Sequence, residues 1–280
     1  MLSALRPLHV DGFGAVLDTD LTDPQTLGLA ADLKVALHRH RVLVIPGQHL
    51  NHADLLTTAA CFGEVDTDVD RRYAVGGFPG LTTISNILED GHRVGVYDGD
   101  HEEEWHADNC FKPNLTGVTL LYSVIAPNQG GQTRIADATA AYAALPADVR
   151  QRIENLRAVH SIQHLATLQN QAGGQSSVAA GTLALHPEVE HPLVLTHPAT
   201  QARSLLLGSM AVRHVVGLTP QESSSLLAEL LAHVTSPRYV YSHRWKAGDL
   251  LVWDNRAVLH TASPCDSSRN QRLLYRAAVR

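Results

Sequence analysis

The order of hydrophobic and polar positions predicts a helix followed by a buried strand in the first fifty residues. In residues 22–48, Asp23 is a suitable N-cap and Pro24 occupies the first turn, while apolar side chains recur at helical spacing up to Leu37. The run RVLVIPG (41–47) is then apolar until a Pro-Gly pair ends it, as expected for a buried strand.

Further elements follow from the same two periods. A helix is predicted in 51–65, closed by Gly63, and another in 219–237, where Thr219 and Glu222 form a capping box and a proline takes the first helical position. Strands are expected in the following runs: 80–88, 116–127, 249–260 and 271–279, with a strand edge and then helices in 133–160. This mixture predicts the α+β class, a barrel or sandwich core with surrounding helices.

The segment 165–186 differs from the rest because it carries no charge and is rich in Gly, Ser, Gln and Ala. Such a composition is typical of a flexible lid insert or a poorly ordered loop. A linker between two domains is the alternative, but strand signals resume at once in HPLVLTHP (191–198). A single domain over 1–280 is therefore expected.

Composition narrows the class of protein. The chain has 280 residues, of which 44% are hydrophobic, so a sizeable core can form. No Lys/Arg-rich block is present at a net charge of −6, which argues against nucleic-acid binding, and no apolar run approaches the length of a membrane span. The N-terminus has no signal-peptide pattern, so a cytoplasmic protein is expected, with three cysteines, none in CxxC spacing, as free thiols.

A histidine and an aspartate two residues apart, His106 and Asp108, form the first candidate site. On a strand they would project to the same side. Because 17 histidines make such a pair a weak signal, a third ligand is needed, and His260 at the end of a hydrophobic strand is the candidate. Two histidines and one carboxylate form the facial triad that holds Fe(II) with open positions.

Two arginines in the last predicted strand strengthen this hypothesis. Arg272 and Arg276 are four residues apart and would share one face. Burying two guanidiniums is costly unless they meet anions, and arginine binds carboxylates through paired hydrogen bonds. The C-terminal strand is therefore suited to hold one or two acidic ligand groups beside a metal.

Longer motifs around these residues resemble the taurine dioxygenase / 2,4-dichlorophenoxyacetate dioxygenase family of Fe(II)- and 2-oxoglutarate-dependent oxygenases. The matching pieces are WHADNCF, GGQTRIADATAAYAALP, HPLVLTHPATQARSLLLG, VGLTPQES, HRWKAGDLLVWDNRAVLHTA and QRLLYRAAV. They stand in the family's order from about residue 8 to the C-terminus. The resemblance implies a double-stranded β-helix, the jelly-roll or cupin-like core, and agrees with a homodimer or homotetramer.

The resemblance also implies individual roles. The residues that match the iron ligands are His106, Asp108 and His260. Thr133 matches the hydroxyl that binds the distal carboxylate of 2-oxoglutarate, and Arg272 matches the arginine that pairs with it. Arg276 matches an arginine that reaches the anionic group of the substrate in the taurine enzyme. The segment from His260 to Arg272 is one residue longer than in the taurine enzyme, which leaves the division of roles between the two arginines open, so Arg276 is also a candidate for binding 2-oxoglutarate.

Positions around the metal depart from the taurine enzyme. Its taurine-gripping histidine and tyrosine lack a counterpart, although Tyr73 lies nearby, and Glu102 falls near the position of a family asparagine. Asn109 follows the metal aspartate in place of valine, and Gly208 replaces the asparagine of many relatives. Tyr73, Glu102 and Asn109 therefore join Arg276 as candidate substrate residues, with a solvated loop as the alternative interpretation of 101–104. The expected substrate is a small organic anion other than taurine, and no macromolecular partner is expected.

The implied reaction oxidises, and in the first place hydroxylates, a C–H bond while O2 and 2-oxoglutarate are converted with release of succinate and CO2. Desaturation or ring formation would use the same cofactors. Asp108 argues against halogenation, because the related halogenases lack the metal carboxylate. A zinc hydrolase with metal-bound water would also fit the triad, but it has no need of Thr133 and the two arginines. A binding or structural protein without activity is the third hypothesis.

Overall fold

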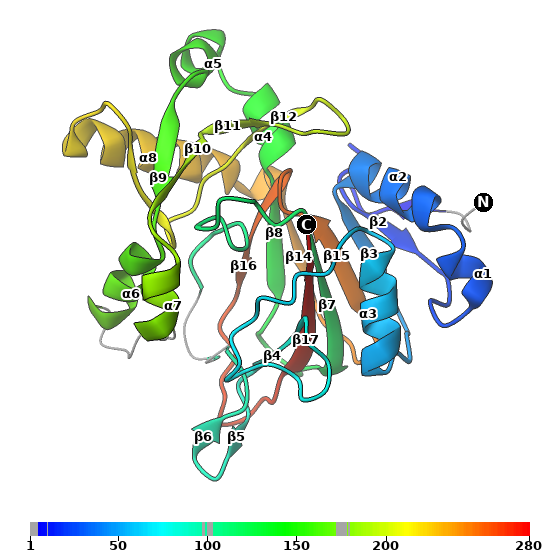
Figure 1. Cartoon of the computed structure of the whole chain (residues 1–280). Helices are drawn as coiled ribbons and strands as arrows, with labels where there is room; N and C mark the ends of the chain where they lie inside the picture. Colours follow the sequence, from blue (N-terminus) through cyan, green and yellow to red (C-terminus); the bar gives the residue numbers. More distant parts are fainter. Residues whose placement is uncertain (1–4, 10, 97–98, 100–102, 172–177, 179) are drawn as a thin grey trace.

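The computed structural model describes the chain apart from residues 1–4, 10, 97–98, 100–102, 172–177 and 179 (Figure 1). A seven-stranded sheet forms its centre, antiparallel except where β2 and β3 pair in parallel. In spatial order its strands are β1 (Leu5–Pro7), β2 (Ala15–Leu17), β3 (Val42–Ile45), β15 (Leu250–Asp254), β7 (Val118–Ile125), β17 (Leu273–Val279) and β4 (Leu81–Ser85).

A second sheet of three antiparallel strands faces the large one (Figure 1). Its spatial order is β14 (Val240–His243), β8 (Thr133–Asp137) and β16 (Val258–Ala262). The outlying strands are β10 (Val189–Pro192), β9 (Arg157–His160) and β13 (Val212–Val215) in one sheet, β11 (Val194–Thr196) with β12 (Arg203–Leu205), and β5 (Leu88–Glu89) with β6 (His92–Arg93).

The helices lie on the outer faces of these sheets (Figure 1). They are α1 (Pro24–Leu27), α2 (Ala30–His40), α3 (His52–Ala60), α4 (Ala138–Ala143), α5 (Ala147–Ile153), α6 (Ile162–Gln171), α7 (Ala180–Leu185), α8 (Pro220–Val234) and a 3-10 turn at Pro237–Tyr239. Among the described residues, no helix combines the length and apolar character needed to cross a membrane.

Both faces of the central strands are buried, and successive side chains serve different cores. In β3, Leu43 and Ile45 pack with the helices α2 and α3, whereas Val42 and Val44 pack between the two sheets. This is the alternation that a strand covered on both sides requires. The predicted α+β class with a sandwich core and outer helices is therefore confirmed.

The same alternation places the polar residues of interest between the sheets. Val258 of β16 and Ile135 of β8 belong to the core between the sheets. His260 and Thr133 lie two residues from them and share their strand faces. The space between the two sheets is therefore where the candidate chemistry gathers.

All three of these helix predictions hold with changed limits. The capping box of α8 is present, with Thr219 accepting from the Glu222 amide and the Glu222 carboxylate accepting from Thr219. The helix predicted within 22–48 is divided, because α1 ends at a Gly28 C-cap and α2 starts at Ala30. Glycine is a weak helix former, so the break falls there. The helix predicted in 51–65 ends at Ala60, three residues before the glycine expected to close it.

The segment 165–186 is more regular than its composition predicts. It contains the last part of α6 and all of α7, so the expectation of a loop without packed elements is wrong for its described residues. Ala, Leu and Gln residues, which favour helix, make up most of α7 and of the part of α6 within this segment. Gln163 connects α6 to the end of α7, because its Nε2 donates to the carbonyls of Leu183 (2.8 Å) and His186 (3.0 Å). The role of a lid and the single-domain assignment remain predictions.

Candidate active site

His106, Asp108 and His260 lie together between the sheets. Each offers one ligand atom, and these atoms are all within 4.8 Å of one another. His106 forms a single β-bridge to His260, with backbone hydrogen bonds of 2.9 and 2.8 Å, so that it extends the small sheet beyond β16. The two imidazole centroids are 4.2 Å apart, and Asp108 Oδ2 is 3.7 Å from His260 Nε2.

The predicted strand through His106 and Asp108 is wrong in one respect. His106 occupies an isolated bridge, and Asp108 already belongs to the turn that follows it. Asn109 adopts a left-handed conformation (φ 51°), which bends the chain away from the sheet. The two side chains still converge, because the Asp108 amide donates to Asn255 Oδ1 at 3.2 Å and fixes the start of the turn.

The hydrogen bond on the far side of the His106 ring orients it as a ligand. His106 Nδ1 lies 2.7 Å from the carbonyl oxygen of Glu104. A carbonyl can only accept, so Nδ1 carries a proton, and Nε2 is the ring nitrogen left for a metal. Burial lowers the pKa of His260 to about 3, with His106 adding to the effect, so this imidazole is neutral at neutral pH. A neutral imidazole is the form that binds a metal.

Asp108 is a buried carboxylate with a partner on each oxygen. Arg276 Nη1 donates to Oδ1 at 3.0 Å, and Thr119 Oγ1 donates to Oδ2 at 2.6 Å. Burial alone would raise the pKa of Asp108, but Arg276, the two histidines and the Thr119 hydroxyl hold it at about 2. Two imidazoles and one ionised carboxylate are a donor set that fits Fe(II).

A second polar group lies deeper between the sheets, around Thr133. Its Oγ1 accepts from Trp245 Nε1 at 3.2 Å and from Arg272 Nη2 at 3.4 Å. Thr133 is 2% and Arg272 1% exposed. Because indole and guanidinium groups can only donate, the Thr133 proton is directed to some other acceptor. A guanidinium and a hydroxyl that both donate form a site suited to one carboxylate.

The structure places only some of the candidate substrate residues beside the triad. Arg276 is at the site, through its bond to Asp108. Asn109 donates from Nδ2 to Thr116 Oγ1 at 3.0 Å and so braces its own turn. Tyr73 lies in a turn beside β4, where its ring is 5.2 Å from the Arg72 guanidinium and its carbonyl oxygen accepts from the Thr83 amide. Glu102 lies outside the described residues.

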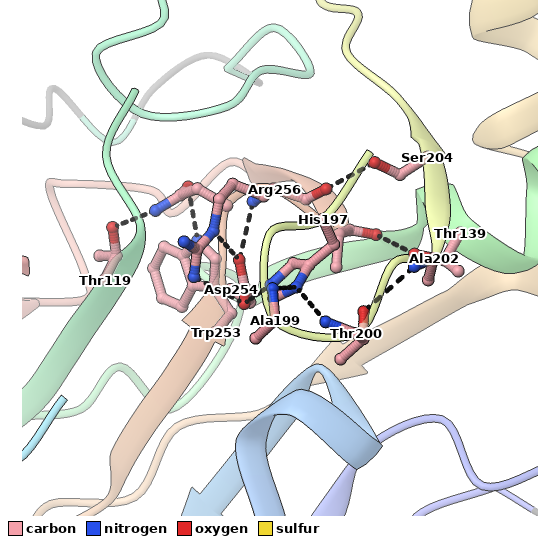
Figure 2. Close-up of polar contacts among 12 residues, drawn as sticks. Thr119, Thr139, His197, Ala199, Thr200, Ala202, Ser204, Trp253, Asp254 and Arg256 are labelled. Atoms are coloured by element: carbon pink, nitrogen blue, oxygen red, sulfur yellow. Dashed lines mark hydrogen bonds and ion pairs between the residues drawn. The ribbon is translucent and has the colours of Figure 1, made fainter. Parts of the chain in front are cut away.

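A second group of potential ligands, His38, His197 and Asp254, has a different character (Figure 2). His197 Nε2 lies 2.7 Å from Asp254 Oδ2, while its Nδ1 accepts from the amides of Ala199 and Thr200. Amides can only donate, so the proton of His197 is on Nε2 and points at Asp254. Neither ring nitrogen is available to a cation, and this group is a structural hydrogen-bond cluster.

Sequence reasoning missed Thr119, Trp245, Asn255 and the His197–Asp254 pair. The single signal for Thr119 was a polar residue among apolar ones on a strand, which is common in sheets. The three cysteines are free thiols, as predicted. Cys110, next to this site, is buried, and burial raises the pKa of its thiol to about 12, with Asp108 adding to the effect.

Comparison with known proteins gives one consistent picture. The model of the family described as "Taurine catabolism dioxygenase TauD, TfdA family" matches residues 4–278. The chain is 33% identical over 277 residues to an alpha-ketoglutarate-dependent 2,4-dichlorophenoxyacetate dioxygenase of Cupriavidus pinatubonensis, covering 96% of this chain and 94% of that protein. It is 30% identical over 244 residues to pentalenolactone F synthase of Streptomyces arenae, covering 84% and 81% of the two chains.

Solved structures agree with the sequence comparisons. The crystal structure of AAD-2 in complex with Mn(II) and N-oxalylglycine superposes with a TM-score of 0.81 at 30% identity, covering 100% of this chain and 97% of that one. A putative alpha-ketoglutarate-dependent taurine dioxygenase from Burkholderia xenovorans gives a TM-score of 0.79 at 30% identity, covering 99% and 88%. The predicted jelly-roll core with surrounding helices is thereby confirmed.

Proposed function

The chain belongs to the taurine catabolism dioxygenase TauD, TfdA family, and from this premise we propose that His106, Asp108 and His260 hold its Fe(II). The protein is a 2-oxoglutarate-dependent non-haem iron dioxygenase that uses Fe(II), 2-oxoglutarate and O2. The observation that carries the assignment is the convergence of three ligand atoms within 4.8 Å, with Asp108 and His260 buried and His106 half-buried.

Bound iron with 2-oxoglutarate and O2 supplies the oxidising power, with release of succinate and CO2, and the protein supplies position. The Glu104 carbonyl fixes the ring of His106, and Arg276 and Thr119 fix the carboxylate of Asp108. The packed core between the sheets keeps water from the far side of the triad, where the Trp253 ring lies 4.7 Å from His260. A rigid, desolvated ligand set is what such a reaction requires.

We propose Arg272 and Thr133 as the anchor of the distal carboxylate of 2-oxoglutarate. Support comes from their burial and from the donor-only groups that turn the Thr133 hydroxyl toward an acceptor. Arg276 lies nearer the metal residues and is 28% exposed. The geometry therefore favours Arg272 for the co-substrate, and it leaves Arg276, alone of the two, within reach of the primary substrate.

For the primary substrate we propose a small organic anion that is hydroxylated at a C–H bond. A guanidinium has five donor hydrogens, so Arg276 can bind Asp108 and a second anion together. The 2,4-dichlorophenoxyacetate named for one relative is a carboxylate. The synthase among the relatives keeps desaturation or ring formation as the alternative outcome.

The test is anaerobic loading with Fe(II) and 2-oxoglutarate, followed by air and a screen of carboxylates, sulfonates and sulfate esters for succinate release. Wild-type protein should release succinate only when Fe(II), 2-oxoglutarate and O2 are all present. Asp108→Ala and His106→Ala should lose this activity, while His92→Ala, which changes an exposed histidine of β6, should keep it. Turnover with zinc and without O2 would instead establish the hydrolase.

A homodimer or homotetramer in the cytoplasm completes the proposal. Three free thiols in 280 residues fit a reducing compartment. Light scattering of the purified protein measures the oligomeric state directly, and a mass of 30.3 kDa would identify a monomer.

A further inference from the structure

Thr119 and Asn255 stand behind Asp108 in a continuous chain of buried hydrogen bonds. Asn255 Nδ2 is 2.8 Å from Thr119 Oγ1, and Thr119 Oγ1 is 2.6 Å from Asp108 Oδ2. Asn255 Oδ1 returns to the same residue, since it accepts from the Asp108 amide at 3.2 Å. Thr119 is fully buried and Asn255 is 4% exposed.

The donors around Asn255 fix the direction of every hydrogen bond in this series. Trp253 Nε1 lies 3.1 Å from Asn255 Oδ1, and an indole N–H, like the Asp108 amide, can only donate. The oxygen of the Asn255 amide therefore faces these two donors, and its NH2 group faces Thr119. Thr119 accepts that hydrogen bond, so its single proton is directed at Asp108 Oδ2.

Asn255 is itself held from behind. It lies in the turn between β15 and β16, and its backbone N–H donates to the Gly117 carbonyl at 2.9 Å. The preceding Asp254 is 1% exposed and binds both Arg256 and His197 (Figure 2). The cluster of His197, Asp254 and Arg256 thus holds the turn from which Asn255 reaches Thr119, and Figure 2 shows Thr119 to the left of this cluster.

We propose that Thr119 and Asn255 are positioning residues that set the orientation of the Asp108 carboxylate toward iron, an inference that depends on the metal site proposed above. Arg276 fixes Oδ1 and Thr119 fixes Oδ2, so the carboxylate cannot rotate freely. Asn255 acts through Thr119. Its side chain donates a hydrogen bond to Thr119 Oγ1, so the proton of this hydroxyl is directed at Asp108. Such outer hydrogen bonds to a ligand carboxylate tune metal affinity by about 10–100-fold.

The test measures metal binding by the full chain, not turnover. Mn(II) is titrated into the apoprotein, and free Mn(II) is followed by electron paramagnetic resonance. Thr119→Val should raise the Kd by about 10–100-fold, whereas Thr119→Ser, which keeps the hydroxyl, should stay within about threefold of wild type. Asn255→Ala should give a smaller loss than Thr119→Val. The double variant should lose no more than Thr119→Val alone, because both residues act through one hydrogen bond.

Ser123→Ala is the matched control. Ser123 lies on β7 like Thr119, it is fully buried, and its Oγ has no hydrogen-bond partner among the described residues. It should bind Mn(II) as wild type does. A wild-type Kd in Thr119→Val, or an equal loss in Ser123→Ala, overturns the positioning role.

Asn255→Ala and His106→Ala keep the proposal testable in every case. If Thr119→Val does not fold, a wild-type Kd in Asn255→Ala overturns the proposal, and a loss that Thr119→Ser does not share supports it. His106→Ala separates the two levels of inference. Equal Mn(II) binding by His106→Ala and wild type overturns the metal site itself, whereas loss in His106→Ala without loss in Thr119→Val overturns only the positioning role.

Discussion

Arg272 Nη2 lies 3.4 Å from the hydroxyl of Thr133, and this contact joins the two sheets at the floor of the site. Thr133 opens β8 of the small sheet, and Arg272 directly precedes β17 of the large one. The carboxylate anchor proposed for this pair therefore requires that the two sheets are packed together, and it cannot form on either sheet alone.

Replacing Arg272 should weaken 2-oxoglutarate binding specifically. We expect Arg272→Ala to raise the 2-oxoglutarate concentration for half-maximal succinate release by about 30-fold or more, because truncating one partner of a buried charge pair costs about 2–5 kcal/mol. Thr133→Val should cost about 1 kcal/mol, roughly fivefold, as one hydrogen bond is lost. Arg269→Ala, whose side chain is 83% exposed, is the control. Unchanged saturation in Arg272→Ala would assign the anchor elsewhere.

Removing the charge of Arg276 should make metal binding more sensitive to acid. The pKa of Asp108 is about 2 because Arg276 and its other partners outweigh its burial, so between about pH 5 and pH 8 the wild-type carboxylate is fully ionised. In Arg276→Met this pKa rises, and protons compete with the metal at the acid end. The Mn(II) Kd of the variant, relative to wild type, should therefore be higher near pH 5 than near pH 8.

The exposed Arg213 supplies the control for that experiment, since its side chain is 53% exposed and pairs with Glu188. Arg213→Met should follow the wild-type pH dependence. If the Mn(II) Kd of Arg276→Met divided by that of wild type is the same near pH 5 and near pH 8, Arg276 does not set the charge state of Asp108.

Gly208 packs directly against the backbone of Trp105 and His106. A Cβ atom there would lie 2.7 Å from the Trp105 carbonyl oxygen and 3.0 Å from His106 Cα, at a φ of 147° that side chains disfavour. Gly208→Ala should push His106 from its bridge and weaken Mn(II) binding about tenfold or more, since overpacking costs about 1–3 kcal/mol. Gly76→Ala, where a Cβ meets nothing within 4 Å, should bind normally. Normal binding by both variants would contradict this account.

The sequence allowed prediction of residues on regular strands. His260 lies on a strand whose hydrophobic neighbours reveal the buried face, so alternation indicates where its side chain points, whereas Thr133 was assigned from the family resemblance of GGQT. Asn255 lies in a three-residue turn between two strands. No periodicity describes the direction of a turn residue, so its contact with Thr119 follows only from the packed structure.

Composition was a poorer guide than alternation for segment 165–186. Its Gly and Ser residues indicate a loop, but its Ala, Leu and Gln residues favour helix, and a Gln163 side chain holds its ends together. Local propensities of opposite sign are decided by such tertiary contacts. For the same reason, the bend after Asp108, which depends on the left-handed Asn109, was not foreseen from an HxD spacing.

His160 should make the fold sensitive to mild acid. It is fully buried, neither ring nitrogen has a hydrogen-bond partner among the described residues, and burial lowers its pKa to about 3, with His191 adding to the effect. The unfolded chain takes up a proton at this histidine below about pH 6.5, whereas the folded chain does so only near pH 3. Stability therefore falls as pH falls through this window, by about 2 kcal/mol between pH 7 and pH 5. His160→Leu should remove that part of the loss in urea unfolding at the two pH values, because leucine has no proton to bind. His92→Leu, at an exposed position, should keep the wild-type loss of stability between the two pH values. A wild-type loss in His160→Leu as well would show that the cost of charging this buried ring is not the cause.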